Sequence, residues 1–257
     1  MSIVLAWTAG RMEGGTPAAS PRADQEETAS SVSDLTFEDL FPRSSVVGVP
    51  PAVAATERLY PEEASSVAGA VEKRRLEFTL GRACGRAALV HLGASAGPIT
   101  VDPERAPVWP RDVVGSITHR SHLAAAAVAW QSHFAGIGLD VETAAQLSPK
   151  VTARVCTAAE LDWISSHPAP KGACWGTVIF SAKEAVYKAI FPLTRRWLGF
   201  SDVEIHLEPD HRRFVSRFVG ESAGRLSSIG ELSGTFAIRD GLVLAAVTLR
   251  RTGTRPP

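Results

Sequence analysis

Cysteine is scarce in this sequence, and the few cysteines that occur are poorly placed for disulfides. The chain of 257 residues has three of them, Cys84, Cys156 and Cys174, without C-x-x-C spacing. Three thiols cannot all pair with one another. We therefore expect reduced, buried thiols, which are typical of a protein in a reducing compartment.

Long apolar runs and a net charge are also missing. The longest apolar run, residues 123–130, is far shorter than the roughly 20 residues of a membrane-spanning helix. The first ten residues have neither the basic leader nor the apolar core of a signal peptide. Because 27 basic residues balance 27 acidic ones, the composition indicates no overall attraction to nucleic acid or anionic membranes. We therefore expect a cytoplasmic protein with no nucleic-acid or membrane partner.

Large apolar side chains are rare between residues 10 and 33. Residues 10–33 mix glycine, proline, alanine, serine, threonine and acids, a composition that cannot offset the entropy lost on ordering. We expect a disordered leader over residues 1–40, and favour a dispensable leader over a functional arm. The whole chain is 45% hydrophobic, so the remaining length can bury a substantial core.

Two carboxylates end an apolar run in the middle of the chain. Asp140 and Glu142 follow the run that starts at Gly136. Side chains two apart in a strand project from the same face, so both carboxylates would point the same way. With Glu184 as a third ligand, they would suit Mg²⁺ or Mn²⁺, ions that prefer oxygen ligands.

Each of these acids also has an interpretation without a metal. An acidic pair after a strand is commonly a solvated turn. Residues 181–184 match the S-x-x-E capping box at the start of a helix. Glu184 and Lys188 have the i,i+4 spacing that stabilises an exposed helix by about 0.2 to 0.5 kcal/mol.

A basic stripe is predicted on a long helix in the first half. We expect this helix over residues 61–92, because a proline opens it and a glycine follows it. At about 100° per residue, Arg75, Arg82 and Arg86 share a narrow sector, and Arg74 lies about 80° from Arg82. Such a stripe is commonly a solvated face. The alternative is a phosphate-binding surface.

Thr118 and His119 end a predicted strand. Residues 113–119 favour a strand, preceded by a shorter one at residues 99–101. Thr118 and His119 would offer a hydroxyl and an imidazole to a phosphate, and Gly115 would let a ligand approach the backbone. A histidine after a strand is more commonly structural, so both interpretations stay open.

The second half is predicted to combine helices with a β-hairpin. We expect helices over residues 158–164 and 180–191, the second ended by Pro192. Strands are expected at residues 203–207, 213–219, 234–238 and 242–247. The last two are joined by Arg239-Asp240-Gly241, a short-range hairpin signal. Long helices and short strands mixed in this way indicate an α+β fold.

Four short blocks occur in one order along the chain: APVWP at 106–110, GSITH at 115–119, IGLDVE at 137–142 and FSAKE at 180–184 with Lys188. With KRRLEF at 73–78 and Arg82 upstream, the chain resembles the 4'-phosphopantetheinyl transferases. The resemblance is to the long, pseudo-dimeric type that serves siderophore, nonribosomal-peptide and polyketide synthases. It covers roughly residues 40–250.

The resemblance implies a fold and a reaction. The fold would be two similar α/β subdomains in a pseudo-twofold arrangement, each a helix on a small antiparallel sheet, with the active site between them. Residues 41–134 would bind coenzyme A, and residues 135–257 would carry the metal and the catalytic helix. The enzyme, a monomer, would transfer 4'-phosphopantetheine from coenzyme A to a serine of an apo acyl or peptidyl carrier protein. Adenosine 3',5'-bisphosphate would be released.

The resemblance also implies roles for single residues. The coenzyme A-binding residues would be Arg74, Arg82, Thr118, His119, Asp140 and Lys188. The metal ligands would be Asp140, Glu142 and Glu184. The catalytic residues would be Glu184 and Lys188, with Glu184 or a metal-bound water as the base.

Two other functions would use similar residues. A Mg²⁺-dependent nucleotide pyrophosphohydrolase could use the same carboxylates, but it would release free phosphopantetheine without any carrier. A non-catalytic regulator that binds coenzyme A or a carrier would share the fold. A member that had lost activity would be expected to lack Glu184 or Lys188, and both are present.

An arginine-rich and aromatic segment, residues 192–200, follows the predicted catalytic helix. We expect Arg195 and Arg196 to steer a carrier protein, with Trp197 and Phe200 docking it, because such residues are enriched at interfaces. The alternative is that Trp197 and Phe200 close the core of the second half.

Overall fold

The computed structural model describes residues 40–41, 47–49, 58–120, 123–170 and 172–251. All structural statements below concern these residues, and the predicted leader falls outside them except for Leu40. Within this part of the chain, no helix is both long enough and apolar enough to cross a membrane.

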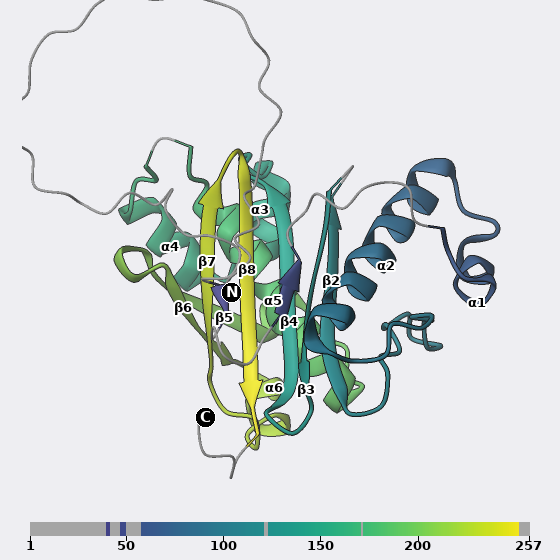
Figure 1. The fold of residues 1–257 in the computed structure, drawn as a ribbon. Helices are drawn as coiled ribbons and strands as arrows, with labels where there is room; N and C mark the ends of the chain where they lie inside the picture. The colour runs from purple at the N-terminus through teal and green to yellow at the C-terminus, as the bar shows by residue number, and fades with distance from the viewer. Residues whose placement is uncertain (1–39, 42–46, 50–57, 121–122, 171, 252–257) are drawn as a thin grey trace, which may run out of the picture.

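The first half is one long helix on a three-stranded sheet. Strands β1 (Val47–Val49), β2 (Val113–Arg120) and β3 (Leu123–Trp130) pair antiparallel in the order β1-β3-β2. Helix α2 (Glu72–Leu92) packs on this sheet (Figure 1). Before it come the short helix α1 (Pro61–Ala64) and the 3₁₀ turn η2 (Ser65–Val67).

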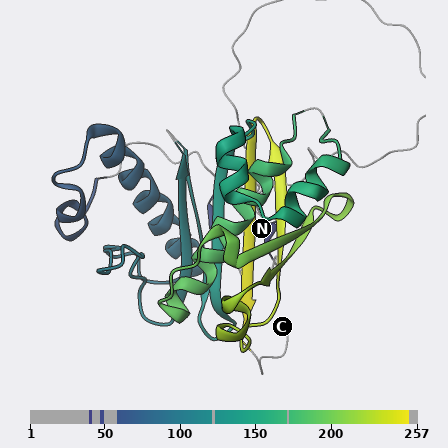
Figure 2. The ribbon, with the colours of Figure 1, turned by 180° about the vertical axis from the view of Figure 1, so that it is seen from behind.

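The second half is a larger version of the same plan. Its antiparallel sheet has the order β4-β8-β7-β6-β5. The strands are β4 (Phe134–Thr143), β5 (Val203–Glu208), β6 (Arg213–Phe218), β7 (Leu232–Arg239) and β8 (Leu242–Arg250). Helix α5 (Trp175–Thr194) covers one face of this sheet, as the view from behind shows (Figure 2). The smaller elements are α3 (Pro149–Val155), α4 (Ala158–Ser166), η3 (Phe200–Asp202), η4 (Pro209–His211) and α6 (Glu221–Arg225).

The predicted α+β class, with a helix on a small antiparallel sheet in each half, is therefore confirmed. The pseudo-twofold relation between the halves stays a prediction. So does the division at Phe134, where β4 begins.

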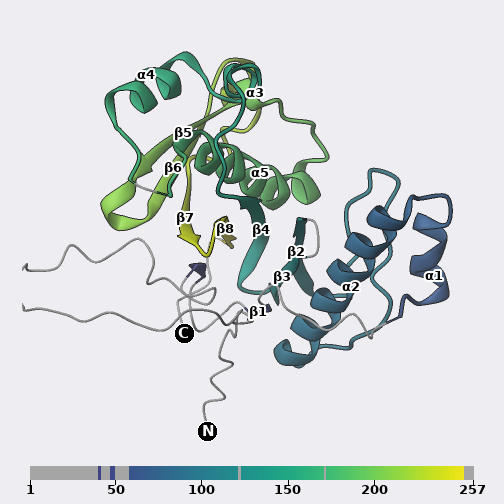
Figure 3. The same cartoon turned by 90° about the horizontal axis from the view of Figure 1, so that it is seen from above.

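The two sheets meet where β2 lies beside β4 (Figure 3). β2 and β4 belong to different sheets, and two side chains of β2 form hydrogen bonds with the backbone of β4. The amide of Leu139 donates to Ser116 Oγ at 3.0 Å, and the amide of Val141 donates to Thr118 Oγ1 at 3.1 Å. Because both contacts have the same sequence offset, the two strands run in the same direction.

Helix α5 packs unusually close to β4. A Cβ atom at Gly136 would overlap the Ala189 carbonyl oxygen, and one at Gly138 would overlap that of Ala185. The two glycines therefore let the helix backbone rest directly on the strand. Since side chains alternate in a strand, Asp140 and Glu142 lie on this same face of β4.

Three local predictions were wrong. The helix predicted over 61–92 is interrupted between Val67 and Glu72, with Gly69 in the break. Residues 99–101 form no strand, and only a single bridge joins Val101 to Pro107. Helix α5 begins at Trp175 instead of residue 180 and continues through Pro192 to Thr194. The 3.6-residue apolar face of α5 extends beyond the local start and stop signals, and its burial against the sheet decides its length.

Candidate active site

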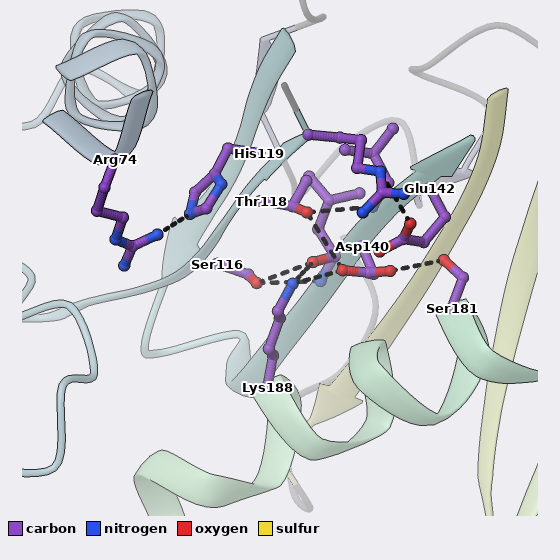
Figure 4. A network of polar contacts seen from close by, with 11 residues as sticks. Arg74, Ser116, Thr118, His119, Asp140, Glu142, Ser181 and Lys188 are labelled. Atoms are coloured by element: carbon purple, nitrogen blue, oxygen red, sulfur yellow. Dashed lines mark hydrogen bonds and ion pairs between the residues drawn. The ribbon is translucent and has the colours of Figure 1, made fainter. Parts of the chain in front are cut away.

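The carboxylate of Asp140 is the centre of the polar network at the junction of the two sheets (Figure 4). Asp140 is buried, with 5% of its surface exposed. Its Oδ1 accepts hydrogen bonds from Lys188 Nζ at 2.6 Å and Thr118 Oγ1 at 3.2 Å. Its Oδ2 accepts one from Ser181 Oγ at 2.9 Å. Side chains from β2 and α5 thus hold one carboxylate of β4 in a fixed orientation.

Ser181 is a site residue that the sequence analysis missed. It was interpreted as the N-cap of a helix, but it lies in the second turn of α5 and is fully buried. Its hydroxyl reaches the neighbouring strand and does not cap the helix. The i, i+4 and i+7 spacing of Ser181, Ala185 and Lys188 could have indicated their shared helix face.

Lys188 joins Asp140 to the backbone of β4. Its Nζ also donates to the carbonyl oxygen of Leu139 at 3.1 Å. The side chain is partly exposed, at 26%, and lines a cavity of about 190 Å³. A cation that is held by a buried carboxylate and still reaches a cavity is well placed to contact an anionic substrate.

Glu142 lies further along the same strand and pairs with Arg120, whose Nε is 3.2 Å from its carboxylate. Burial raises the pKa of the Glu142 carboxyl, and the negative charge of Asp140 raises it further. The carboxylate is therefore less strongly acidic than an exposed one.

Glu184 faces a second cavity, of about 400 Å³, between α5 and residues 197–201. Burial raises the pKa of its carboxyl, and nearby Asp140 also raises it, whereas Lys188 lowers it. A raised pKa makes a glutamate a better proton acceptor near neutral pH.

Asp140, Glu142 and Glu184 do not converge on one point here. In the described part of the chain, no group of three acidic, histidine or cysteine side chains is arranged to hold a metal ion. The donor chemistry nevertheless fits a hard divalent cation. The negative charges of Asp140 and Glu184 raise the pKa of Glu142, and that of Asp140 raises the pKa of Glu184. A cation would relieve this repulsion.

A basic group lies across the junction on α2. Arg74 Nη1 contacts His119 Nε2 at 2.9 Å, and His119 Nδ1 is 3.6 Å from Glu77. Because arginine only donates, Nε2 is the acceptor and the ring proton is on Nδ1. Burial lowers the pKa of His119, and the charge of Arg74 lowers it further. Arg75, which helical spacing favoured over Arg74, is exposed.

The two remaining arginines of the predicted basic stripe on α2, Arg82 and Arg86, are both buried. Arg82 is 5% exposed, lies 4.1 Å from the centre of the Phe78 ring, and has a buried Nε without a hydrogen-bond partner. Burial lowers its pKa to about 10. Arg86 is also buried and bonds to Glu63 at 2.9 Å. The interpretation of this stripe as a solvated face is therefore wrong for Arg82 and Arg86. The Nε–H of Arg82 remains able to donate a hydrogen bond.

Two expectations about β2 are revised. The hydroxyl of Thr118 donates to Asp140 and accepts from the Val141 amide, so it orients the carboxylate. Gly115 does leave room for close approach, but the group beside it is the Trp109 ring, whose Nε1 donates to the Gly115 carbonyl at 3.0 Å. The Trp109 ring, and not a ligand, therefore occupies the space next to Gly115.

Residues 195–200 divide into free and engaged side chains. Arg195 donates to Asp102 and is not a free steering charge, which corrects that expectation. Trp197 is 80% exposed and makes an edge contact with Tyr187, so it does not close the core. Phe200 packs against the core cluster of the second half, as the alternative predicted.

The three cysteines agree with the prediction of reduced thiols. None of the three, which all lie in the described part of the chain, forms a disulfide. Cys84 and Cys156 are buried and Cys174 is partly buried.

Comparisons with known proteins match both halves of the chain. Residues 62–129 match the 4'-phosphopantetheinyl transferase N-terminal domain, and residues 136–247 match the 4'-phosphopantetheinyl transferase superfamily. The chain is 37% identical to 4'-phosphopantetheinyl transferase PptT of Mycobacterium tuberculosis over 227 residues, 86% of this chain and 97% of that protein.

Two other relatives are similar over shorter stretches. The chain is 39% identical to 4'-phosphopantetheinyl transferase Svp of Streptomyces mobaraensis over 194 residues, 74% of this chain and 78% of that protein. It is 35% identical to enterobactin synthase component D of Escherichia coli O157:H7 over 135 residues, 52% and 62% of the two chains. The chain therefore belongs to the 4'-phosphopantetheinyl transferase superfamily, as an enzyme of its long type.

Proposed function

We propose that this enzyme uses coenzyme A as donor and Mg²⁺, or Mn²⁺ in its place, to modify a serine of apo acyl or peptidyl carrier proteins. The serine hydroxyl oxygen forms a bond to the β-phosphorus of coenzyme A, and the bond from that phosphorus to the bridging oxygen breaks. Adenosine 3',5'-bisphosphate leaves with the electron pair, and the serine proton passes to a base. A cytoplasmic location and a monomeric state stay predictions.

The observation that carries this proposal is the Asp140 carboxylate, held at the sheet junction between a basic group on α2 and acids on β4 and α5. Coenzyme A has phosphates at two places, so its recognition needs cations on one side and a charge-neutralising site on the other. Arg74 and Arg82 would supply the cations, and His119, which contacts Arg74, would lie beside the bound coenzyme. Asp140, Glu142 and Glu184 would hold the metal ion.

When bound, the metal ion would neutralise the negative charge of the pyrophosphate and of the leaving phosphate. Lys188 would contact the phosphate that is transferred, because its partly exposed side chain lines the adjacent cavity. Asp140 holds the Lys188 side chain in place. Thr118 would act on the coenzyme only through Asp140.

Glu184 would accept the proton of the attacking serine. It faces the 400 Å³ cavity, and the exposed Trp197 lines the same cavity. A carrier protein that packs against Trp197 would bring its serine close to Glu184. Most of the rate enhancement would come from proximity and electrostatics, as in other phosphoryl-type transfers.

Intact-mass analysis of an apo carrier protein tests this function. After incubation with coenzyme A and Mg²⁺, the carrier should gain the mass of one phosphopantetheine group. A carrier whose acceptor serine is replaced by alanine is the control, and a chelator should stop the reaction. If coenzyme A were cleaved while the carrier mass stayed constant, the pyrophosphohydrolase would be the correct function.

A further inference from the structure

The C-terminal end of α5 is tied to a turn in the other half of the molecule. Arg195, the residue that follows α5, donates through Nη1 to a carboxylate oxygen of Asp102. The same nitrogen is 3.5 Å from Glu104. The Arg195 guanidinium also lies 5.8 Å from the centre of the Phe191 ring on α5. The contact therefore joins two segments that are more than ninety residues apart in sequence.

Asp102 is also the residue that organises this turn. Its Oδ1 accepts the amide of Ala106 at 2.8 Å. Its backbone amide donates to the Ala106 carbonyl at 2.9 Å, and its carbonyl accepts the amide of Arg105 at 2.9 Å. Because Oδ2 is the atom bound by Arg195, one carboxylate both shapes the turn and anchors it to α5.

The turn forms a wall of the 190 Å³ cavity that Lys188 lines. Residues 104–107 form one side, residues 115–117 of β2 form another, and Tyr187, Lys188, Phe191 and Pro192 of α5 complete it. Residues 103–105 of the turn are also exposed to solvent. The Arg195 contact thus ties this wall to the end of α5.

We propose that Asp102 and Arg195 form a latch that sets the width of this cavity and so limits which coenzyme A thioesters the enzyme accepts. Arg195 is a positioning residue in this scheme. The inference rests on the proposed function, in which Lys188 contacts the phosphate that bears the pantetheine arm. The arm is a thin, uncharged chain, and it would extend from Lys188 into the cavity. An acyl group on its sulfur adds bulk that a closed wall would resist.

The latch is an ion pair at the surface, so its strength should depend on salt. The side chain of Arg195 is 52% exposed and that of Asp102 is 13% exposed. Salt screens charges that are exposed in this way. High ionic strength should therefore weaken the selectivity of the wild-type enzyme in the same direction as removal of Arg195.

The test compares coenzyme A with acetyl- and hexanoyl-coenzyme A in the wild-type, Arg195→Ala and Asp102→Asn enzymes. Carrier modification gives kcat/KM, and calorimetry gives the binding constant without any carrier. In each variant, the ratio of kcat/KM for hexanoyl-coenzyme A to kcat/KM for coenzyme A should rise by about two- to fivefold. This range corresponds to the free energy of an exposed ion pair. Arg217→Ala is the matched control, because Arg217 is 54% exposed and pairs with Glu231 at 2.6 Å, away from the cavity.

The outcomes separate the latch from the proposed function. If Arg195→Ala and Asp102→Asn keep wild-type ratios in both assays, as Arg217→Ala should, the latch is wrong. If one variant is unstable, the other variant and the salt series of the wild type still decide. A wild type that binds coenzyme A but modifies no carrier would contradict the proposed function, and its binding selectivity would still test the latch. A protein that does not bind coenzyme A would overturn both.

Discussion

At the scale of single residues, the site depends on how one carboxylate is held. Asp140 receives hydrogen bonds from a threonine on β2 and from a serine and a lysine on α5. A buried carboxylate without such partners would favour its neutral form, because burial penalises the charge. The three donors therefore offset the cost of burying this carboxylate and orient it toward the junction.

Replacement of Ser181 by alanine tests this orienting role. The change removes the donor to Asp140 Oδ2 but leaves Lys188 and Thr118 in place. We expect carrier modification to fall about ten- to a hundredfold, the usual effect of losing a partner of a metal ligand. Steady-state kinetics with varied Mg²⁺ measures the effect. Ser165→Ala, on the exposed face of α4, is the control. Wild-type kinetics for Ser181→Ala would remove Ser181 from the site.

Arg82 has an unused donor inside the protein, so its replacement tests coenzyme recognition. Arg82→Ala should weaken coenzyme A binding by about 1.5 to 3 kcal/mol, the value of a hydrogen bond to a charged group. Calorimetry measures this change. Arg75→Ala removes an exposed arginine from the same helix and should have little effect. Equal affinities for the two variants would show that Arg82 is structural.

His119 links protonation to stability. Its pKa in the folded protein is below the ordinary value of 6.5, because the ring is buried and contacts Arg74. As the pH falls below about 6.5, the unfolded chain takes up the proton first, so the free energy of unfolding decreases. Between pH 7.5 and 5.5, the wild type should lose more stability than His119→Gln in denaturant unfolding. Equal losses would mean that His119 titrates normally.

At the scale of elements, the packing of α5 on β4 places Ser181 and Lys188 beside Asp140. Gly136 and Gly138 make this packing possible, because any side chain there would meet a helix carbonyl. A second restraint is the buried pair of Lys183 and Glu160, joined at 2.8 Å. Lys183 also donates to the Val155 and Phe200 carbonyls, at 2.9 and 2.8 Å, and so fixes the surroundings of the Glu184 cavity.

Gly138→Ala tests the close packing. The added methyl group would overlap the Ala185 carbonyl oxygen, so the helix would have to move. We expect a loss of about 1 to 3 kcal/mol in the free energy of unfolding, the usual cost of overpacking, with reduced transfer activity. Gly224→Ala in α6 is the control, because nothing lies within 4 Å of its Cβ position. Comparable stability of the two variants would contradict the model of packing.

At the scale of the whole molecule, the two halves share a hydrophobic core. One cluster combines Ala125 and Ala127 of β3 with Ile137 and Leu139 of β4 and Leu244 of β8. Separating the halves would expose this cluster and break the contacts of Ser116 and Thr118 with β4. Residues 41–134 and 135–257 are therefore expected to depend on each other for stability.

A shared core predicts cooperative unfolding. Denaturant transitions followed by far-UV circular dichroism and by tryptophan fluorescence should coincide, because both halves contain tryptophans and secondary structure. Two separated transitions, or stable folding of either half when produced alone, would show that the halves are independent domains.

Features that depend on neighbours in the sequence could be predicted. The hairpin between β7 and β8 follows from Asp240 and Gly241, which both adopt positive φ angles, 49° and 73°. The alternation of side chains in a strand places Asp140 and Glu142 on one face. The glycine after α2 adopts a φ of 77° and ends the helix, as predicted. In each case, residues within a few positions determine the backbone.

The contacts of the site depend on how distant segments meet. A local capping signal made Ser181 look like a helix start, whereas its hydroxyl bonds to Asp140, 41 residues away. Helical spacing favoured Arg75, but the position of β2 brings His119 to Arg74. Arg195 was expected to be free, yet Asp102 lies beside it. The sequence alone therefore determined most of the elements and the shared face of Asp140 and Glu142. Only the tertiary structure decided the partners, because burial against another element outweighs the small local preferences of a single residue.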